Sequence, residues 1–195
     1  KFRSFCPVSH LSFLNEISPT KEISSEIYYT IGKVVSLNKK TINNLKRQAS
    51  RTTRQRCRIC THKSVADSHH EMIIVHKDNT YVRPHKHLNK PESFHVLEGN
   101  AVLTIFDDAG SIIQTVEVGD YASEKKFYYR IDAPYYHTLF ITSPVLVFHE
   151  TTSGPFSKSD TVFAPWSPEE TNTYEVRRFM GKLESNINKF LAKNV

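Results

Sequence analysis

The sequence predicts a mainly β protein, built as an antiparallel sandwich or barrel and extended at each end by a helix. From residue 70 onward, about eight short runs rich in β-branched and aromatic residues alternate with turn residues, which is typical of such folds. Near both ends of the chain the apolar residues instead recur at helical spacing. At 195 residues, one domain with appendages is the expected organisation.

The start of the chain has the weakest pattern. Residues 1–26 show little periodicity and predict a loosely structured arm, with one helical turn near residues 10–17. The run 26–37, EIYYTIGKVVSL, is rich in β-forming residues and predicts a strand.

A basic helix is expected next, over residues 38–51. Ile42, Leu45 and Ala49 recur at helical spacing, and Asn38 precedes them as a residue type favoured at helix N-caps.

The β region begins at residue 70. The turn around Gly110 separates two alternating runs and predicts a hairpin. The expected strands lie within residues 70–77, 80–85, 93–99, 101–110, 111–120, 127–134, 137–144 and 145–151.

A second helix closes the sequence. The segment 163–170 contains two prolines, which break any strand, and the run 174–193 then places apolar residues on one helical face. We expect this amphipathic helix to pack on the β domain or on a subunit partner. Its apolar positions are Val176, Phe179, Leu183, Ile187 and Phe190.

These patterns divide the chain into three parts. Residues 1–53 form the arm, strand and basic helix, residues 54–168 form the β-barrel, and residues 169–195 form the C-terminal helix.

The positive charge is concentrated in the first third. Residues 1–63 hold 13 basic and 3 acidic residues, whereas residues 64–195 hold 13 basic and 17 acidic ones. The segment 39–63 contains no acid at all. An anionic partner is therefore expected, either a phosphate-bearing ligand, an acidic face of the same fold, or nucleic acid.

Location is predicted from what the sequence lacks. No apolar run approaches the roughly 18 residues of a membrane span, and no secretory signal pattern opens the chain. Three cysteines fit a reducing compartment better than a disulfide framework. We expect a cytoplasmic protein that does not enter a membrane.

Four residues predict a metal site. His85 and His87 alternate on one face of a strand, and Glu92 follows a short loop containing Pro91, so that a hairpin returns its carboxylate to the same face. His137, late in the strand series, is the best candidate for a further ligand. Imidazoles with a carboxylate suit one divalent ion of Zn, Fe, Mn, Ni or Co, and such a set leaves one or two positions for water or substrate.

The spacing resembles a known pattern. His85 and His87, then Glu92 after four residues and Gly99 after six more, are similar to the first motif of the cupin superfamily, and His137 resembles its second. The resemblance implies a double-stranded β-helix, or jelly-roll barrel, with a metal inside.

Four positions depart from the cupin pattern. Asn79 stands where Gly is usual, and it still suits a turn. Asp132, Pro134 and Ile141 replace the commoner residues around His137, which concerns the shape of the preceding loop more than the histidine.

Further segments extend the match beyond the cupin motifs, among them residues 54–62, 70–75, 81–87, 90–99, 147–156 and 163–170. Over about residues 36–170 the chain resembles the WbuC family of cupin-fold metalloproteins. The resemblance implies a role in O-antigen and surface-polysaccharide biosynthesis and a sugar or nucleotide-sugar ligand. Isomerase, epimerase and dioxygenase chemistry remain open.

Five residues are candidates for binding that ligand. Arg56 and Arg58 alternate onto one face of a short strand and suit a phosphate or carboxylate, and Lys90 lies in the loop before Glu92. Tyr129 and Arg130 belong to a cluster shortly before His137 and suit a sugar ring, although filling the barrel is the commoner role of such aromatics.

Candidate acid, base or orienting groups are His62, His70, Glu71 and Glu150. Alternation along the strand turns either Glu150 or His149 inward, and the sequence does not choose between them. Cys57 and Cys60 form C-x-x-C without a second pair, and a structural role is expected for both.

Three functions are compatible with these residues. The first is a metal-dependent enzyme acting on a small anionic ligand, and the second is a non-catalytic ligand-binding or sensor cupin. The third, nucleic-acid binding through residues 39–63, lacks any accompanying motif. We also expect a homodimer.

Overall fold

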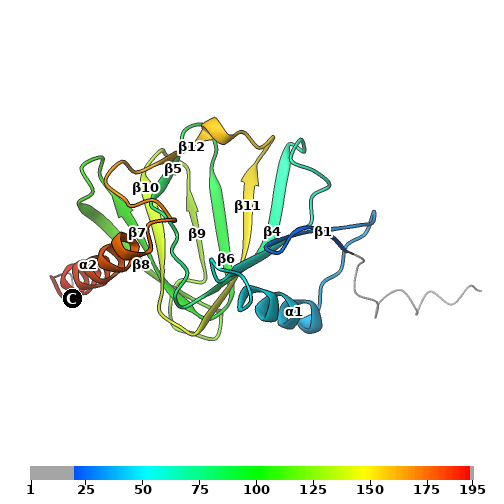
Figure 1. Cartoon of the computed structure of the whole chain (residues 1–195), viewed down its shortest axis with the longest axis horizontal. Coiled ribbons are helices and arrows are strands. Elements are labelled where there is room, and N and C mark those ends of the chain that lie inside the picture. Colours follow the sequence, from blue (N-terminus) through cyan, green and yellow to red (C-terminus); the bar gives the residue numbers. More distant parts are fainter. Residues whose placement is uncertain (1–19, 194–195) are drawn as a thin grey trace, which may run out of the picture.

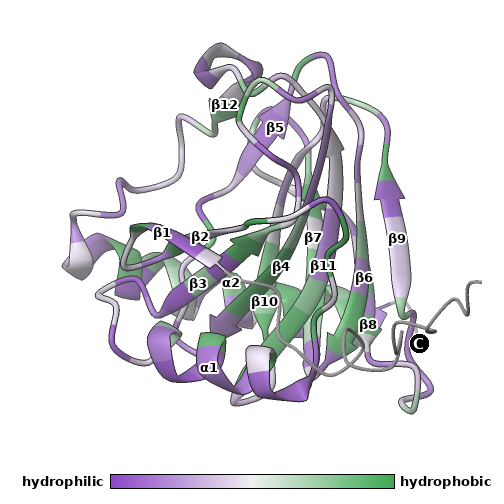
Figure 2. Ribbon diagram, turned by 90° about the vertical axis from the view of Figure 1, so that its right-hand side faces the viewer, coloured by the Kyte–Doolittle hydropathy of each residue, from purple (hydrophilic) through white to green (hydrophobic). Residues whose placement is uncertain are grey.

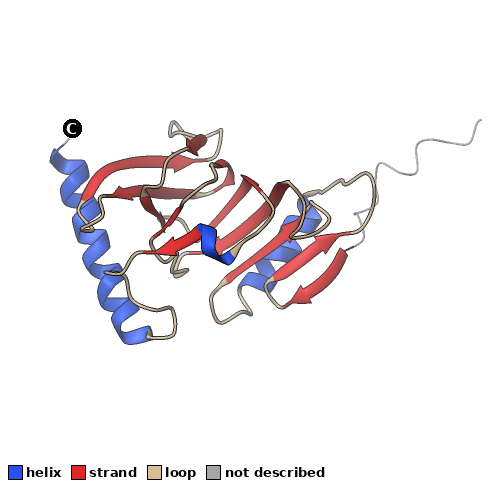
Figure 3. Cartoon of the chain, turned by 90° about the horizontal axis from the view of Figure 1, so that it is seen from above, coloured by secondary structure: helices blue, strands red, loops and turns tan. Residues whose placement is uncertain are grey.

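Two β-sheets face each other and enclose the apolar interior, with one helix outside each sheet (Figures 1 and 3). The computed structural model describes residues 20–193. One sheet has the order β1-β2-β3-β4-β11-β6-β9, and the other has the order β12-β5-β10-β7-β8.

The first sheet is the larger. Its central strands β4, β11 and β6 are antiparallel neighbours, whereas β2 and β3 run parallel. Its strands are β1 (Thr20–Ser24), β2 (Ile27–Thr30), β3 (Arg56–Cys60), β4 (His69–Lys77), β6 (Glu92–Glu98), β9 (Tyr128–Ile131) and β11 (Val145–Ser153).

The second sheet is antiparallel throughout. Its strands are β5 (His85–His87), β7 (Asn100–Phe106), β8 (Ile112–Gly119), β10 (Tyr136–Ile141) and β12 (Thr161–Phe163), and the 3-10 helix η1 (Lys158–Asp160) precedes β12.

The order of the strands identifies a jelly roll. From β4 to β11, successive strands supply β4-β11-β6-β9 in one sheet and β5-β10-β7-β8 in the other, which is the arrangement of two Greek keys folded over each other. The predicted mainly β fold, with a strand-helix extension before it and a helix after it, is confirmed.

The interior is apolar at one end and polar at the other. Its core consists of residues from both sheets, among them Phe94, Leu103, Leu139 and Phe148. In Figure 2, hydrophobic stretches colour β4, β10 and β11, while β5 and β12 lie at the upper, more hydrophilic end. The polar end, which we call the open end, carries the candidate site.

Helix α1 (Lys39–Ala49) covers β3 and β4 from outside. Asn38 caps its first turn through Oδ1, which accepts from the backbone N–H groups of Lys40 and Thr41. Leu45 and Ala49 are buried against the outer side of the sheet. The predicted helix and its cap are therefore confirmed.

Helix α2 (Thr173–Lys193) lies against the outer side of the second sheet. Leu183 and Ile187 are its buried residues, and they pack with Val102, Phe106 and Tyr136. Of the two expected placements, the helix takes the one on its own β domain.

Two strand predictions were too long. The expected strand 26–37 ends at Thr30, and Gly32 follows with a φ of 146°. The expected strand 80–85 is reduced to His85 at the start of β5, because Pro84 has no N–H to donate to a neighbouring strand. The helical turn predicted near residues 10–17 lies outside the described residues.

β1 and β12 were not predicted. Both are short strands at sheet edges, where few buried residues mark a pattern. Among residues 20–193, no helix is long and apolar enough to cross a membrane.

We expect Ile187→Ala to lower the free energy of unfolding by about 2 to 4 kcal/mol, because it leaves a cavity between α2 and the sheet. Ser185→Ala on the exposed side of the same helix is the matched control and should change it by less than about 0.5 kcal/mol. Urea unfolding measures both variants. Equal stability of the two would contradict the packing described for α2.

Candidate metal centre

Four side chains from three strands converge at the open end. His85 and His87 come from β5, Glu92 begins β6, and His137 lies on β10. One ligand atom of each lies within 4.8 Å of the others. The strand order explains the convergence: β10 pairs with β5, placing His137 opposite His85, and β6 faces them from the other sheet.

The carboxylate of Glu92 lies at the centre of the group. Its Oε1 is 2.6 Å from Nε2 of His137, and its Oε2 is 3.0 Å from Nε2 of His87. The ring centroids of His85 and His137 are 4.6 Å apart. Each histidine therefore reaches the others or the carboxylate directly.

Hydrogen bonds on the far side of each ring orient the histidines. Nδ1 of His85 is 2.8 Å from the carbonyl oxygen of Arg83, and Nδ1 of His137 is 2.9 Å from that of Tyr135. A ring that donates from Nδ1 to a carbonyl keeps the lone pair of a neutral imidazole on Nε2, which is the arrangement seen in metal-binding histidines.

His87 has a different orienting partner. Its Nδ1 is 3.2 Å from the hydroxyl oxygen of Thr161 on β12. No local pattern predicts a role for Thr161, because β12 is three residues long and its pairing with β5 is not encoded in local spacing.

The group is buried and electrostatically coupled. Glu92 is 3% exposed and His137 is 4% exposed. Burial would raise the pKa of Glu92, but the charge and close approach of His137, with His87, lower it below its ordinary value. Burial opposes charge on His137 too, yet Glu92 raises its pKa.

His85 behaves differently from His137. Burial, with the charge of His137, lowers the pKa of His85 to about 3, so that its ring is neutral at physiological pH. A neutral imidazole is the form that binds a metal.

The polar atoms fit a metal ion. Glu92 Oε1 and His137 Nε2 are both buried, and despite their short separation neither makes a hydrogen bond of acceptable geometry. Buried polar atoms that converge in this way, without hydrogen bonds between them, are typical of the ligands of a metal site. A bound divalent ion would supply a Lewis acid or a site for dioxygen.

A polar row extends from the metal candidates across the larger sheet. Thr152 on β11 pairs with Glu92 on one side and with His70 on the other. Because directly paired residues point to the same face, His70 faces the interior. Its Nε2 is buried without a hydrogen-bond partner, and its ring stacks on that of His62 at 4.1 Å.

Glu150 also faces the interior, in the next row. It pairs with Phe94, a core residue, whereas His149 points outward. Burial raises the pKa of Glu150 to about 8, the charge of Glu92 adds to this effect, and Arg58 and Lys90 oppose it. The choice between Glu150 and His149, which the sequence left open, thus falls on Glu150.

Arg58 and Tyr129 border the same space. Arg58 pairs with the core residue Ile74, and its Nε is buried without a partner. The hydroxyl of Tyr129 is likewise buried and unpartnered, and burial raises its pKa, with Glu92 and Glu150 contributing. These groups are suited to donate hydrogen bonds to a ligand inside the barrel.

Lys90 lies in the loop between β5 and β6. Its Nζ is 5.6 Å from the centre of the Phe156 ring, and its charge acts on His70 and Glu150. Lys90 is therefore near the interior groups but at the edge of the barrel.

Two candidates lie on the outer face, away from the site. Glu71 lies on the outer face, within 4 Å of His69 and His149. Arg130 alternates with Tyr129 and is exposed, paired with Asp132. Strand alternation places each of them on the face opposite the interior.

Arg56 is the remaining ligand candidate, and it makes ion pairs instead. Its guanidinium lies 3.6 Å from Glu26 and 3.2 Å from Glu170, and Arg54 pairs with the same two acids. Part of the basic charge of residues 39–63 is thus met by acids of the same fold, while other cations of the segment are exposed.

The two cysteines of the C-x-x-C pattern point to opposite faces. Cys57 packs toward α1 and Cys60 toward the interior, and both are buried free thiols. Burial raises the pKa of Cys57 to about 12, which leaves it an unreactive thiol.

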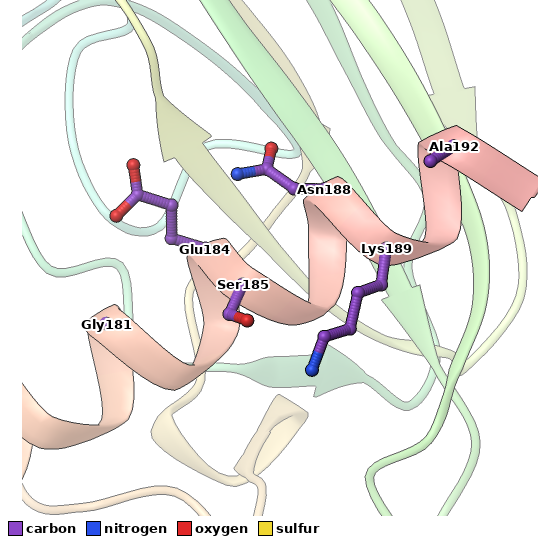
Figure 4. A pocket seen from close by; sticks show the side chains of 6 residues that line it. All are labelled: Gly181, Glu184, Ser185, Asn188, Lys189 and Ala192. Carbon is purple, nitrogen blue, oxygen red and sulfur yellow. The ribbon is translucent and has the colours of Figure 1, made fainter.

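A surface hollow along α2 is separate from this group. Small and polar side chains of the helix line it, and none of the metal or ligand candidates contributes (Figure 4). The lining residues are Gly181, Glu184, Ser185, Asn188, Lys189 and Ala192.

Comparison with known sequences gives one match. The model of a domain of unknown function (DUF6016) matches residues 37–118, a range that includes His85, His87 and Glu92 but not His137. No curated protein matches the sequence.

Several solved structures are similar to part of this chain. Protein SO0799 from Shewanella oneidensis has a TM-score of 0.46 at 9% identity, over 54% of this chain and 72% of its own. The capsular polysaccharide assembling protein CapF from Staphylococcus aureus has a TM-score of 0.41 at 19% identity, over 50% of this chain and 27% of its own. Oxalate decarboxylase from Bacillus subtilis has a TM-score of 0.40 at 18% identity, over 51% of this chain and 24% of its own.

The position of Glu150 predicts how stability depends on pH. The folded protein binds this proton more tightly than the unfolded chain, whose ordinary pKa is 4.5. The resulting stabilisation is complete below about pH 4.5 and is lost as the pH rises through about 8. In metal-free protein, Glu150→Gln should remove a fall of more than about 1 kcal/mol in unfolding free energy between pH 5 and pH 8.

Urea unfolding at a series of pH values, with a chelator present, measures the difference between wild type and variant. That difference reports on Glu150 and on His137, whose pKa the charge of Glu150 helps to raise, because histidines that Glu150 does not influence contribute equally to both proteins. Glu124→Gln, at an exposed position, is the control. Parallel pH profiles for wild type and Glu150→Gln would show that Glu150 is not held protonated.

Proposed function

We propose that this protein is a cupin-type metalloprotein that binds one divalent metal ion through His85, His87, Glu92 and His137. One observation carries the proposal: three imidazoles turn Nε2 toward a buried carboxylate, and hydrogen bonds from Nδ1 hold them in that orientation. Zn, Fe, Mn, Ni and Co all accept this ligand set.

We further propose a small anionic ligand beside the metal, derived from a sugar or a nucleotide sugar. Arg58 and Lys90 supply positive charge, while Tyr129 and Glu150 offer groups that hydrogen-bond to hydroxyls. With the resemblance to the WbuC family, these groups support a role in surface-polysaccharide biosynthesis in the cytoplasm.

The groups inside the barrel favour catalysis over ligand binding without turnover. Glu150 lies within electrostatic range of Glu92 and His137 and is positioned to exchange a proton with a ligand held there. Isomerase, epimerase and dioxygenase chemistry are all compatible with this arrangement. A non-catalytic sensor cupin is the alternative, and it would bind the same ligands without turnover.

Metal binding should raise the melting temperature of the protein by several degrees. A ligand at 100 times its dissociation constant adds about 2.7 kcal/mol to the free energy of unfolding. We expect chelator-treated protein to take up one equivalent of Co²⁺ or Zn²⁺, measured by elemental analysis, and to be stabilised by it.

His85→Ala should lose both the uptake and the stabilisation, whereas His69→Ala, which changes an exposed histidine on the same protein, should keep them. Full metal uptake by His85→Ala would rule out the proposed ligand set.

The expected homodimer has a candidate surface on the outside of β6 and β9. Leu97 is 44% exposed and Tyr128 is 51% exposed there, and neither helix covers them. β9 is also an edge strand, which natural proteins usually cover or protect. We propose that a second copy of the chain packs on this face.

Light scattering should therefore give twice the chain mass of 22.5 kDa. Leu97→Lys should shift the protein toward the monomer, because it places a charge in the apolar contact. Val34→Lys, at an exposed position outside the strands, is the control. A wild-type monomer at the highest soluble concentration would contradict the proposal.

A further inference from the structure

Exposed apolar side chains surround the open end of the barrel. They come from the β3–β4, β5–β6 and β9–β10 connections and from the segment between β11 and the end of β12. Each is between 45% and 56% exposed. We call this set the rim: Val65, Leu88, Tyr135, Phe156 and Phe163.

The rim adjoins the metal candidates. Phe163 pairs with His85 across β12 and β5, and the two ring centroids are 6.3 Å apart. Tyr135 supplies the carbonyl that orients His137. Leu88 follows His87 directly, and its N–H donates to the carbonyl of Asp160 at 3.1 Å.

The connections that carry the rim are held together. The N–H of Phe156 donates to the carbonyl of Val65 at 2.7 Å, and the hydroxyl of Thr152 donates to the carbonyl of Pro91 at 2.8 Å. Single exposed apolar residues are ordinary on a protein surface, but a group of them at one end of a barrel marks a candidate binding surface.

Two rim rings lie next to cations. Lys90 Nζ is 5.6 Å from the centre of Phe156, and the guanidinium carbon of Arg83 is 4.7 Å from the centre of Phe163. Arg83 is also paired with Glu169, but among the described residues Lys90 has no carboxylate within ion-pair distance. The rim thus offers flat rings beside a cation that is available to an anion.

Inside the barrel, buried polar groups are available to hydrogen-bond to a ligand. His70 is 5% exposed and Tyr129 is 8% exposed, yet Nε2 of His70 and the hydroxyl of Tyr129 have no hydrogen-bond partner. His70 lies beside the backbone of Asp67 and Gly154, whereas the buried hydroxyl of Tyr129 indicates a polar group that enters from the open end.

From the interior outward, the order is polar hydrogen-bonding groups, then the cation Lys90, then flat apolar rings. We propose that the ligand is a nucleoside diphosphate sugar rather than a free sugar. Its sugar lies at the metal centre, its diphosphate at Lys90, and its base on the ring of Phe156 or Phe163. This inference rests on the proposed function and chooses between the two ligand classes that it contains.

Binding of UDP, ADP and inorganic pyrophosphate to the metal-loaded protein tests the inference by calorimetry. Stacking of a base on an aromatic ring is worth about tenfold or more in affinity. We therefore expect UDP or ADP to bind at least about tenfold more tightly than pyrophosphate. Equal affinity for the nucleotide and for pyrophosphate, or no binding of either, would overturn the inference.

Two variants locate the contacts. Phe156→Leu and Phe163→Leu keep an apolar side chain but remove the ring, and at least one should reduce the preference for nucleotide over pyrophosphate to about one. Lys90→Ala should weaken nucleotide and pyrophosphate alike. Tyr174→Ala removes an exposed ring from α2 and is the matched control, which should bind as wild type does.

The nucleotide-binding test and the metal-uptake test can fail independently of each other. Uptake of one metal equivalent without nucleotide preference would leave the metal centre standing and reject the nucleotide-bearing ligand. Nucleotide binding that both Phe→Leu variants retain in full would place the base elsewhere and would also reject the inference.

Discussion

The burial of Glu92 is the constraint around which the open end is organised. A carboxylate that is almost fully removed from water is costly unless donors or positive charges surround it. His87 and His137 meet this requirement, and they reach Glu92 because the jelly roll places β5 and β10 opposite β6. The environment of Glu92 therefore depends on both sheets: the carboxylate belongs to β6 of the larger sheet, and the histidines that contact it belong to β5 and β10 of the second sheet.

Alternation within a strand explains why much of the candidate site could be predicted from the sequence. His85 and His87 needed only a period of two, and Glu92 needed only a hairpin. His137 is far away in the sequence, and its place depended on the resemblance to a known motif. The sequence did not predict which face of each strand points inward. Arg130 and Glu71 were chosen by residue type, but neighbouring core residues decide the inward face, and both residues lie on the outer one. The same rule turned Glu150 inward and His149 outward.

The basic segment 39–63 serves more than one purpose in the structure. Several of its cations, among them Lys39, Arg51 and Lys63, are exposed. Arg54 and Arg56 instead meet Glu26 and Glu170 from distant parts of the chain and so join the extensions to the barrel. Arg58, two residues further along, points inward and keeps an unpartnered nitrogen. The strand register places Arg58 opposite the core residue Ile74.

β12 connects the C-terminal part of the chain to the candidate metal ligands. Thr161 holds the ring of His87, and three residues later the N–H of Ala164 donates to the carbonyl of Pro84. The same segment continues to Trp166, whose ring stacks on Phe179 of α2. One short segment, residues 161–166, therefore both positions a candidate metal ligand and anchors the last helix on the barrel.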